Sequence, residues 1–442
     1  MHSFRSLLGI LLACVIGASA LSGCAPRTDS DGVIHVPSEA GSLAQAEELA
    51  QPGDVILIAP GDYEEQLLVS TPDITIRGED RNTTVIDAAG IRPFGIAVMA
   101  DGVRVENLTV TGATFYGLLF TGLHDDTGPS APTAAGYEPW SPADFPPLQR
   151  FLADHVTATN NGLYGIYAFN AQHGIIRDSY ASGSADSGIY VGQCTECDVL
   201  VTGNVAERNA VGFENSNASD SVFVVGNRFS NNRVGLTLLS NYQEAFHPQR
   251  GNLIAGNIIS DNNETQTPVQ ATGGFGTGIG ISGGTSNLVT RNRIESNHRA
   301  GIVLTNAEDL ATTGNAFIDN VLQDNASAVV NVSAERAPAS SNCASPSAED
   351  TIPSDLSAAM HSPNCEPSTA ATTASPPQPS AAPDWPEAPE GISFRSVGLP
   401  QDQPNLPPSH SYGRLPDDVS LPDPARISVP DPAFLSEASG IR

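Results

Sequence analysis

Glycine recurs along this chain at a nearly fixed interval, and each time it precedes a short apolar stretch. The eight glycines are Gly95, Gly117, Gly165, Gly188, Gly212, Gly235, Gly278 and Gly301. The steps between them are 22, 48, 23, 24, 23, 43 and 23 residues, so the long steps read as single periods that carry an insert. Positions +1 and +3 after each glycine are mostly apolar, and alternation with a period of two indicates a β-strand. Because one such unit cannot bury its own apolar side, the repeat predicts a solenoid of stacked coils.

Asparagine forms a second periodic pattern in the same region. One column comprises Asn204, Asn227, Asn257, Asn292 and Asn315, and the other, five residues further on, comprises Asn209, Asn232, Asn262, Asn297 and Asn320. Asparagine tolerates a left-handed backbone and caps local amides. Its side-chain amide also bonds to an identical amide in a neighbouring strand layer. The two columns therefore predict two corners in each coil, with amides stacked from coil to coil.

Together, the glycine strands and the asparagine corners resemble the right-handed parallel β-helix family, which has the pectate-lyase-like fold, over roughly residues 33 to 330. The predicted fold class is all-β, with a short N-terminal capping helix at residues 42–50 (SLAQAEELA). The alternative is a globular β-sandwich, which would show turn signals every ~8–12 residues without a fixed phase.

The N-terminal segment has the composition of an export signal. Residues 1–23 contain Arg5 and the apolar run LLGILLACVIGASA. The following Cys24 completes a sequence, LSGC, that resembles a bacterial lipobox. This resemblance implies lipidation of Cys24, a linker over residues 24–32, and a location at the outer face of the bacterial cell membrane. An ordinary signal peptide with an incidental cysteine is the alternative.

Cysteine usage agrees with export. The cysteines that remain are Cys194, Cys197, Cys343 and Cys365. An even number in an oxidising compartment indicates two disulfides, whose pairing the sequence leaves open, although the CxxC motif is short enough to pair locally. That motif lacks the βαβ context of a redox site, and its neighbours offer no further ligands, so no metal site is predicted.

The composition changes after the solenoid, which we place at residues 33–335. Residues 336–442 are rich in proline, alanine, serine and aspartate and show no second apolar period, so they predict a tail that is mostly disordered or draped on the solenoid. The formal net charge is −29, and lysine is absent. Nucleic acid is therefore a poor partner.

Position +2 after each glycine lies between the two inward positions and so points outward. This outward column comprises Ala97, Leu119, Tyr167, Tyr190, Glu214, Thr237, Gly280 and Val303. Tyr167, Tyr190 and Glu214 are consecutive in it, and aromatic rings beside a carboxylate suit a sugar ligand. Two other interpretations stand beside this one: the three are ordinary outer-face strand residues, or the tail covers them.

Three inserts, at residues 123–150, 241–250 and 263–277, flank this column. Long loops on a rigid scaffold often carry binding and catalytic groups, so the groove between them and the column is the candidate site. Tyr137 and Trp140 are candidates to close over a ligand. The candidates for acid, base and charge stabilisation are Glu214, Glu244, His247 and Arg250.

Enzyme families with the β-helix fold are recognised by motifs that this chain lacks. Asp125-Asp126 lies in an insert and His173-Gly174 at a corner, whereas polygalacturonase-type hydrolases carry such pairs on successive coils. Their Arg-x-Lys motif requires lysine, and the Asp-Pro-His motif of alginate-epimerase-like proteins does not occur. No acidic cluster shares a strand with the arginines that a lyase would need, so no cofactor is predicted and Ca²⁺ stays a possibility without support.

The sequence favours an exported, lipid-anchored cell-envelope protein that binds a glycan or another envelope component on its outer face. The alternative is a polysaccharide-modifying enzyme, a lyase, hydrolase or epimerase with a non-standard site. A third class, accessory factors that assist copper-enzyme maturation, fits poorly because no Met-rich or His-rich cluster occurs. Fold alone does not separate these classes.

Overall fold

The computed structural model describes residues 32–130, 140–269, 273–369, 382–385, 387–408 and 414–440. The chain divides into two units, Met1–Gly32 and Val33–Arg442, and the second unit holds the strands. The predicted export signal and Cys24, as well as Tyr137, lie outside the described residues. In the part of the chain that is described, no helix has the length and apolar character to cross a membrane.

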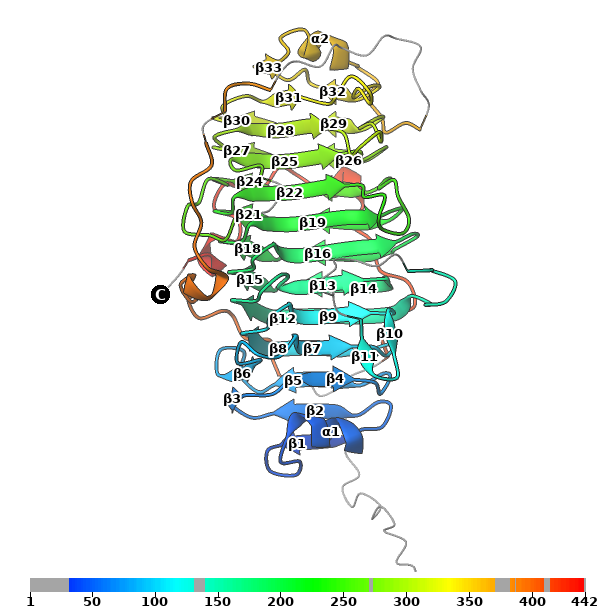
Figure 1. The fold of residues 1–442 in the computed structure, drawn as a ribbon, viewed down its shortest axis with the longest axis vertical. Helices are drawn as coiled ribbons and strands as arrows, with labels where there is room; N and C mark the ends of the chain where they lie inside the picture. Colours follow the sequence, from blue (N-terminus) through cyan, green and yellow to red (C-terminus); the bar gives the residue numbers. More distant parts are fainter. Residues whose placement is uncertain are drawn as a thin grey trace, which may run out of the picture. The chain divides into compact units, whose positions relative to one another are not determined.

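Each coil contributes strands to parallel sheets that run along the stack (Figure 1). One sheet has 11 strands, and its neighbours follow the coils in order. Its strands are β4 (Leu67–Val69), β7 (Phe94–Val98), β9 (Tyr116–Thr121), β13 (Ile166–Phe169), β16 (Ser187–Cys194), β19 (Val211–Ala218), β22 (Val234–Leu239), β25 (Thr277–Ser282), β28 (Ala300–Thr305), β31 (Val329–Asn331) and β33 (Thr351–Ile352). We call this the groove sheet, because the candidate site lies on its outer side.

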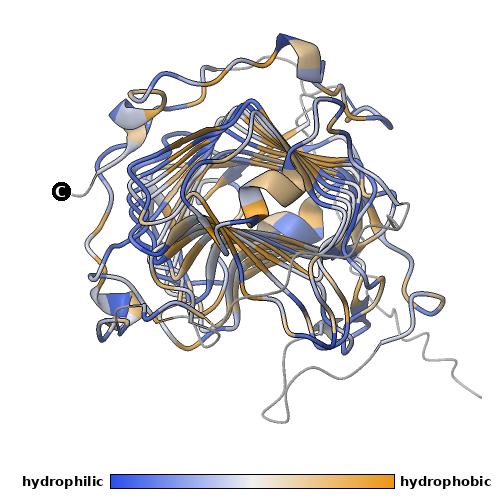
Figure 2. Ribbon diagram, turned by 90° about the horizontal axis from the view of Figure 1, so that it is seen from above, coloured by the Kyte–Doolittle hydropathy of each residue, from blue (hydrophilic) through white to orange (hydrophobic). Residues whose placement is uncertain are grey.

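The second sheet has 20 strands in two runs that share the long strands β8 and β12. The first run is β1 (Val33–Val36), β2 (Val55–Ile58), β5 (Thr75–Gly78), β8 (Arg104–Thr111), β12 (Leu148–Thr159), β14 (Ala171–Arg177), β17 (Val199–Thr202), β20 (Val222–Val225), β23 (Leu253–Ala255), β26 (Leu288–Thr290), β29 (Ala316–Ile318) and β32 (Cys343–Ser345). The second run adds β3 (Gly61–Tyr63), β6 (Thr84–Asp87), β15 (Tyr180–Ser182), β18 (Val205–Glu207), β21 (Arg228–Ser230), β24 (Ile258–Ser260), β27 (Arg293–Glu295) and β30 (Val321–Gln323). Seen along the stack, each coil therefore has three sides (Figure 2).

The glycine and asparagine columns meet inside the coils. A Cβ atom on Gly235 would lie 2.6 Å from Asn262 Nδ2 and 2.7 Å from the carbonyl oxygen of Gly278 in the next coil. Asn262 itself accepts a bond from Asn232 Nδ2 (3.2 Å) and donates one to Asn297 Oδ1 (3.1 Å). The predicted stacking of amides is thus confirmed, and it explains the period, since any side chain at the glycine would collide with the stacked amides.

The last members of the two predicted asparagine columns are wrong. Asn292 Nδ2 donates to Asn320 Oδ1 (3.0 Å), and Asn297 Nδ2 donates to Asn325 Oδ1 (2.9 Å). Asn315 instead accepts from Asn287 and belongs to a third column. The reason is that consecutive members are 28 residues apart in this coil, so a constant step of 23 residues selects the wrong residue.

A short helix, α1 (Leu43–Leu49), lies within the predicted 42–50 segment. Ser42 caps it by accepting a hydrogen bond from the backbone N–H of Gln45 (3.1 Å). Leu43 and Ala46 are fully buried and belong to the main hydrophobic core. The helix contacts β1 and β4, so its apolar side covers apolar side chains at the first coil.

The stack extends past residue 335. β32 pairs with β29, and β33 pairs with β31, and a second helix, α2 (Leu356–Met360), follows. The insert after β9 forms a small hairpin of β10 (His124–Asp125) and β11 (Gly128–Pro129). The cysteines are joined as Cys194–Cys197 and Cys343–Cys365.

The described parts of the C-terminal tail, 387–408 and 414–440, lie against the outside of the coils and include the short 3-10 helices η1 (Phe394–Ser396), η2 (Pro424–Arg426) and η3 (Ser436–Ala438). Arginines of the solenoid donate to main-chain carbonyl groups of this tail. Arg233, for example, bonds the carbonyls of Pro389 (2.8 Å) and Glu390 (2.9 Å). The others are Arg77, Arg81, Arg228, Arg291 and Arg293. The carbonyl groups of a proline-rich segment are not paired within a helix or sheet, so they accept hydrogen bonds from the guanidinium groups instead.

Candidate functional site

The outward column has the predicted register. Tyr167 pairs with Tyr190, Tyr190 with Glu214, and Glu214 with Thr237 on adjacent strands of the groove sheet. Thr237 is followed by Gly280, which in turn pairs with Val303. The outer side of this sheet therefore carries an aromatic section, an acidic section and a section of small side chains, in that order.

The aromatic section is covered and does not form an open platform. Tyr167 and Tyr190 are each only 2% exposed, and their rings meet edge to face with centroids 4.7 Å apart. They belong to a buried outer cluster of Phe94, Ala97, Tyr116, Leu119, Tyr164, Tyr167, Phe169 and Tyr190. Leu123 and Trp140 from the 123–150 insert pack on this cluster, as do Leu68, Phe115 and Leu163 of the coils, so the insert helps to remove these rings from solvent.

Two inserts meet above β16. Trp140 Nε1 donates to Gln193 Oε1 (2.6 Å), and the backbone N–H of Ala245 donates to the same oxygen (3.3 Å). The rings of Trp140 and Phe246 also lie 6.2 Å apart. Trp140 is therefore a packing residue that fastens the first insert to the second, which differs from its expected role over a ligand.

The acidic section consists of carboxyl groups that are buried beside one another. Glu214 is 7% and Glu244 is 9% exposed. Ser187 Oγ donates to Glu214 Oε2 (2.8 Å), and Ser216 Oγ donates to Glu244 Oε2 (2.6 Å). Burial raises the pKa of Glu214 well above its usual range, and the neighbouring carboxylate of Asp186 raises it further. Burial likewise raises the pKa of Glu244, so the neutral acid is favoured at both positions.

The four predicted catalytic candidates do not converge. Glu214 and Glu244 are neighbours, but neither is among the residues that line the open groove on β22, β25 and β28. The ring of His247 packs edge to face against Tyr242 with centroids 4.9 Å apart. Arg250 Nη2 forms an ion pair with Asp220 Oδ2 (2.6 Å), and its backbone bridges to Thr285 on the other sheet's side of the coil. Each of the four side chains therefore contacts a different partner, and they do not form one catalytic group.

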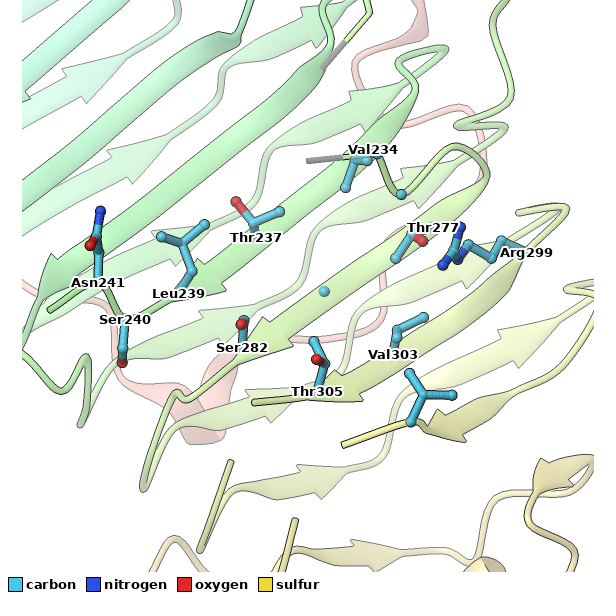
Figure 3. Close-up of a pocket in the computed structure, with 14 residues that line it drawn as sticks. Val234, Thr237, Leu239, Ser240, Asn241, Thr277, Ser282, Arg299, Val303 and Thr305 are labelled. Carbon is cyan, nitrogen blue, oxygen red and sulfur yellow. The ribbon is translucent and has the colours of Figure 1, made fainter. Parts of the chain in front are cut away.

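An open groove follows the acidic section on the same side of the same sheet (Figure 3). It has a volume of about 500 Å³, crosses β22, β25 and β28, and reaches Val332, the residue after β31. Polar lining comes from Thr237, Ser240, Asn241, Thr277, Ser282 and Thr305, and apolar lining comes from Val234, Leu239, Val303 and Val332. Gly280 forms the middle of its floor, since an added Cβ would meet only Thr237 and Thr277 methyl groups at 3.8 and 4.0 Å.

Three polar atoms in this groove are buried without a hydrogen-bond partner among the described residues: Thr237 Oγ1, Thr277 Oγ1 and Arg299 Nε. Thr277 is only 3% exposed. Native structures leave few such atoms, and each one requires a reason. Three of the eleven such atoms among the described residues lie in this groove, which makes it the candidate site.

Arg299 lines the groove and stacks on Trp385 of the C-terminal segment. Its guanidinium carbon lies 3.5 Å from the centroid of the Trp385 ring. Trp385 also packs beside Ala300, Val303 and Val330. Burial lowers the pKa of Arg299, and the stacked ring holds the guanidinium plane in place.

Two other groups of described side chains bring one histidine and two carboxylates together. In the first, Asp154 already bonds His155 Nδ1 (2.6 Å) and Arg177 Nε (2.8 Å), with Asp178 nearby. The second group is His173, Asp198 and Asp418, in which Asp198 also accepts the backbone N–H of Val419. Asp154 of the first group therefore already bonds residues of the coil, and Asp198 of the second group bonds the tail.

Comparison with known proteins identifies the fold. The family described as periplasmic copper-binding protein (NosD) matches residues 98–275, and the family described as right handed beta helix region matches residues 245–345. With the parallel strand pairing, these matches make the chain a right-handed parallel β-helix protein, as predicted. No curated protein matches it.

Several solved structures resemble the chain at low identity. The A-module of mannuronan C-5 epimerase AlgE4 from Azotobacter vinelandii is 14% identical, with 70% of this chain and 94% of that chain covered and a TM-score of 0.41. The periplasmic alginate epimerase AlgG is 16% identical, covering 69% and 72%, with a TM-score of 0.41. Pectate lyase Pel9A is 15% identical, covering 62% and 63%, with a TM-score of 0.37.

The groups of possible metal ligands in and beside the segment matched by the NosD family each combine one histidine with two aspartates in the part of the chain described. Copper sites use histidine, cysteine or methionine ligands. Cys194 and Cys197 in the matched segment are joined to each other, and neither group of candidate metal ligands contains more than one histidine.

Proposed function

We propose that this protein is exported and binds a polysaccharide chain in the groove that crosses β22, β25 and β28 and reaches Val332 in the next coil. The observation that carries the proposal is the set of unpartnered polar atoms in that groove, above all Thr277 Oγ1, which is buried although no described residue bonds it. A buried hydroxyl without a partner destabilises the free protein by about 1–3 kcal/mol. A ligand with hydroxyl groups would supply the missing hydrogen bonds.

The shape of the groove supports a chain-like ligand. Adjacent parallel strands lie ~4.8 Å apart, so the three strands and Val332 in the next coil span roughly 15 Å, enough for several sugar units. Hydroxyl-bearing residues repeat across these strands, as at Ser282 and Thr305, which are paired on β25 and β28. Aliphatic side chains such as Leu239 and Val303 lie between them and suit the apolar faces of sugar rings.

The side chains that line the groove favour a protein that binds the polysaccharide without cleaving it. A glycosidase needs two carboxyl groups on either side of the bound chain. Glu214 and Glu244 are buried behind serine hydroxyls and do not line the groove. Apart from Arg299, the groove's polar side chains are hydroxyl and amide groups, which bind sugars but do not cleave them.

Export and lipid anchoring complete the proposal. Two disulfides favour an oxidising compartment. The N-terminal segment resembles a lipoprotein signal that ends at Cys24, and the matched family is described as periplasmic. A protein held by lipid at the outer face of the cell membrane would meet the polysaccharides of the envelope.

The test is retention of the purified protein by a panel of immobilised bacterial and plant polysaccharides. Gly280→Leu fills the floor of the groove and is expected to abolish retention of the selected polysaccharide. Gln323→Leu places the same side chain on the exposed strand β30, away from the groove, and is expected to leave retention unchanged. Retention that survives Gly280→Leu, or no retention across the panel, would contradict the proposal.

A further inference from the structure

We infer that the groove contains an oxyanion site built from Arg299 and Thr277, and that the ligand is a largely uncharged glycan with isolated carboxylate or sulfate groups. This inference rests on the proposed function, because it specifies the chemistry of the chain that the groove binds. It concerns the end of the groove where Figure 3 shows the two side chains close together.

Arg299 is a cation that the described protein does not neutralise. Among the described residues, no carboxylate lies within ion-pair distance of its guanidinium group, and Nε is buried without a hydrogen-bond partner. Two other buried arginines of the solenoid are occupied. Arg77 pairs with Glu106 (3.1 Å), and Arg233 donates to Thr267 and to tail carbonyls. Since Arg299 lines the groove and the Trp385 ring is the one partner that its guanidinium group has among the described residues, it is placed to bind an anion.

The stacking on Trp385 determines how Arg299 can bind. Because the ring covers one face of the guanidinium plane at 3.5 Å, a further partner is expected at the edge, where the N–H groups are. That edge is a planar fork whose donors match two oxygen atoms of a carboxylate or sulfate. The tryptophan therefore keeps the fork in a fixed orientation.

Thr277 provides the second donor. Thr277 pairs with Ala300 across β25 and β28, and the backbone N–H of Arg299, the residue before Ala300, bonds the carbonyl of Gly276 (2.8 Å), so Arg299 lies diagonally opposite Thr277. Thr277 is 3% exposed, and its hydroxyl has no partner in the described structure. A hydroxyl and a guanidinium edge in adjacent positions, both unpartnered, form a built site for one oxyanion.

The rest of the groove explains why the anionic groups should be isolated. Arg299 is the one ionisable side chain among the residues that line the groove as described, and the others are hydroxyl, amide, glycine or aliphatic. The chain has a formal net charge of −29, which repels a uniformly charged polyanion at long range. One cation in an uncharged groove matches one anionic substituent on an otherwise neutral segment.

Affinity electrophoresis of the full-length protein tests the inference. The probes are gellan, which carries sparse carboxylates, carboxyl-reduced gellan, lightly sulfated dextran, unmodified dextran and polygalacturonate. The wild type is expected to bind gellan or lightly sulfated dextran at least about tenfold more tightly than its uncharged counterpart, the effect of one charge-assisted pair. Preference for gellan would identify a carboxylate, and preference for sulfated dextran a sulfate.

Three variants assign the preference to Arg299. Arg299→Gln is expected to remove the preference while binding of the uncharged polymer persists. Arg299→Lys keeps the charge but loses the planar fork, so an intermediate preference is expected. Arg250→Gln removes an arginine that is ion-paired at another corner and is expected to behave as the wild type. Thermal unfolding of each variant shows whether it is folded.

Several outcomes would overturn the inference. They are equal wild-type binding of charged and uncharged polymers, strongest binding of polygalacturonate, or a preference that survives Arg299→Gln. If uncharged polymers bind and Gly280→Leu removes that binding, the oxyanion site alone is refuted and the proposed function stands. If no polymer binds the wild type, both fail.

Discussion

Gly280 lies beside Thr237 in the outward column, and a Cβ added to it would meet the Thr237 methyl group at 3.8 Å, an ordinary van der Waals distance. The position thus has room for a side chain. Gly278, two residues earlier, differs because its Cβ would lie 2.5 Å from the carbonyl oxygen of Gly301. The periodic glycines are required by the coil, whereas the packing does not require Gly280. Because Gly280 has no side chain, the floor of the groove has space for the proposed ligand.

Thr277→Val should separate stability from binding. Valine has nearly the shape of threonine but lacks the hydroxyl, which in the free protein is buried without a partner. We expect the free energy of unfolding to rise by about 1 kcal/mol and the affinity for the selected polysaccharide to fall about tenfold. Thermal denaturation and isothermal titration calorimetry measure the two effects. A lower stability with unchanged affinity would show that Thr277 has a structural role only.

Tyr190→Ala should mainly affect stability. The side chain is 2% exposed within the aromatic cluster, and its ring contacts Tyr164 and Tyr167. Truncation of a buried aromatic residue costs about 3–5 kcal/mol. We therefore expect a large fall in the unfolding temperature and easier proteolysis of the 123–150 insert. A glycan-binding defect in a variant with wild-type stability would instead restore the interpretation of this ring as part of a ligand platform.

The sequence could predict the register but not which part of the outward column is open. Spacing from glycine to glycine determines which residues are neighbours on adjacent strands, so Tyr167, Tyr190 and Glu214 follow one another as expected. Coverage depends on how an insert packs, and Trp140 reaches the column through a contact with Gln193 that no local pattern predicts.

One signal for the open section was present in the sequence. Along the outward column, bulky Tyr167 and Tyr190 give way to Thr237 and then Gly280. Because Thr237 and Gly280 are much smaller than the two tyrosines, the outer surface of the sheet is expected to be hollow at their end of the column. The aromatic residues led us to predict the ligand site at the opposite end of the column. The apolar surface of an aromatic ring favours both sugar binding and burial in the protein, so the sequence does not distinguish the two.

The acidic section should make stability depend on pH. Burial raises the pKa of Glu214 well above that of an unfolded glutamate and the pKa of Asp186 to about 6. Below the pKa values of the unfolded chain both states are protonated, and the contribution to stability is fully present. As the pH rises through the folded-state values, the unfolded chain ionises more readily, and this contribution is lost.

Glu214→Gln tests this dependence, because glutamine can still accept the hydrogen bond from Ser187. We expect the wild-type unfolding temperature to fall between about pH 5 and pH 8, by an amount equivalent to ~1–3 kcal/mol, and the variant to show a flatter profile. Asp324→Asn, at an exposed turn, is the control and should keep the wild-type profile. Parallel profiles for wild type and Glu214→Gln would refute the assignment.

Arg81→Met should loosen the attachment of the tail. The side chain is 1% exposed, and its guanidinium group donates to Thr157 Oγ1 (2.9 Å) and to the carbonyls of Val156 (3.0 Å) and Pro404 (3.1 Å). Loss of these bonds leaves buried acceptors unsatisfied, and we expect at least ~3 kcal/mol of destabilisation with faster proteolysis within 401–408. Arg336→Met, at an exposed arginine, is the control. Unchanged protease resistance would mean that the tail is held independently of Arg81.

The most direct test of the groove as a binding site is a crystal structure of the protein with the polysaccharide fragment that the panel selects. The account predicts that the fragment lies across β22, β25 and β28, over Gly280, with a hydroxyl or anionic oxygen within hydrogen-bond distance of Thr277 Oγ1. A fragment bound on another side of the coil, or over Tyr167 and Tyr190 after displacement of the 123–150 insert, would contradict it.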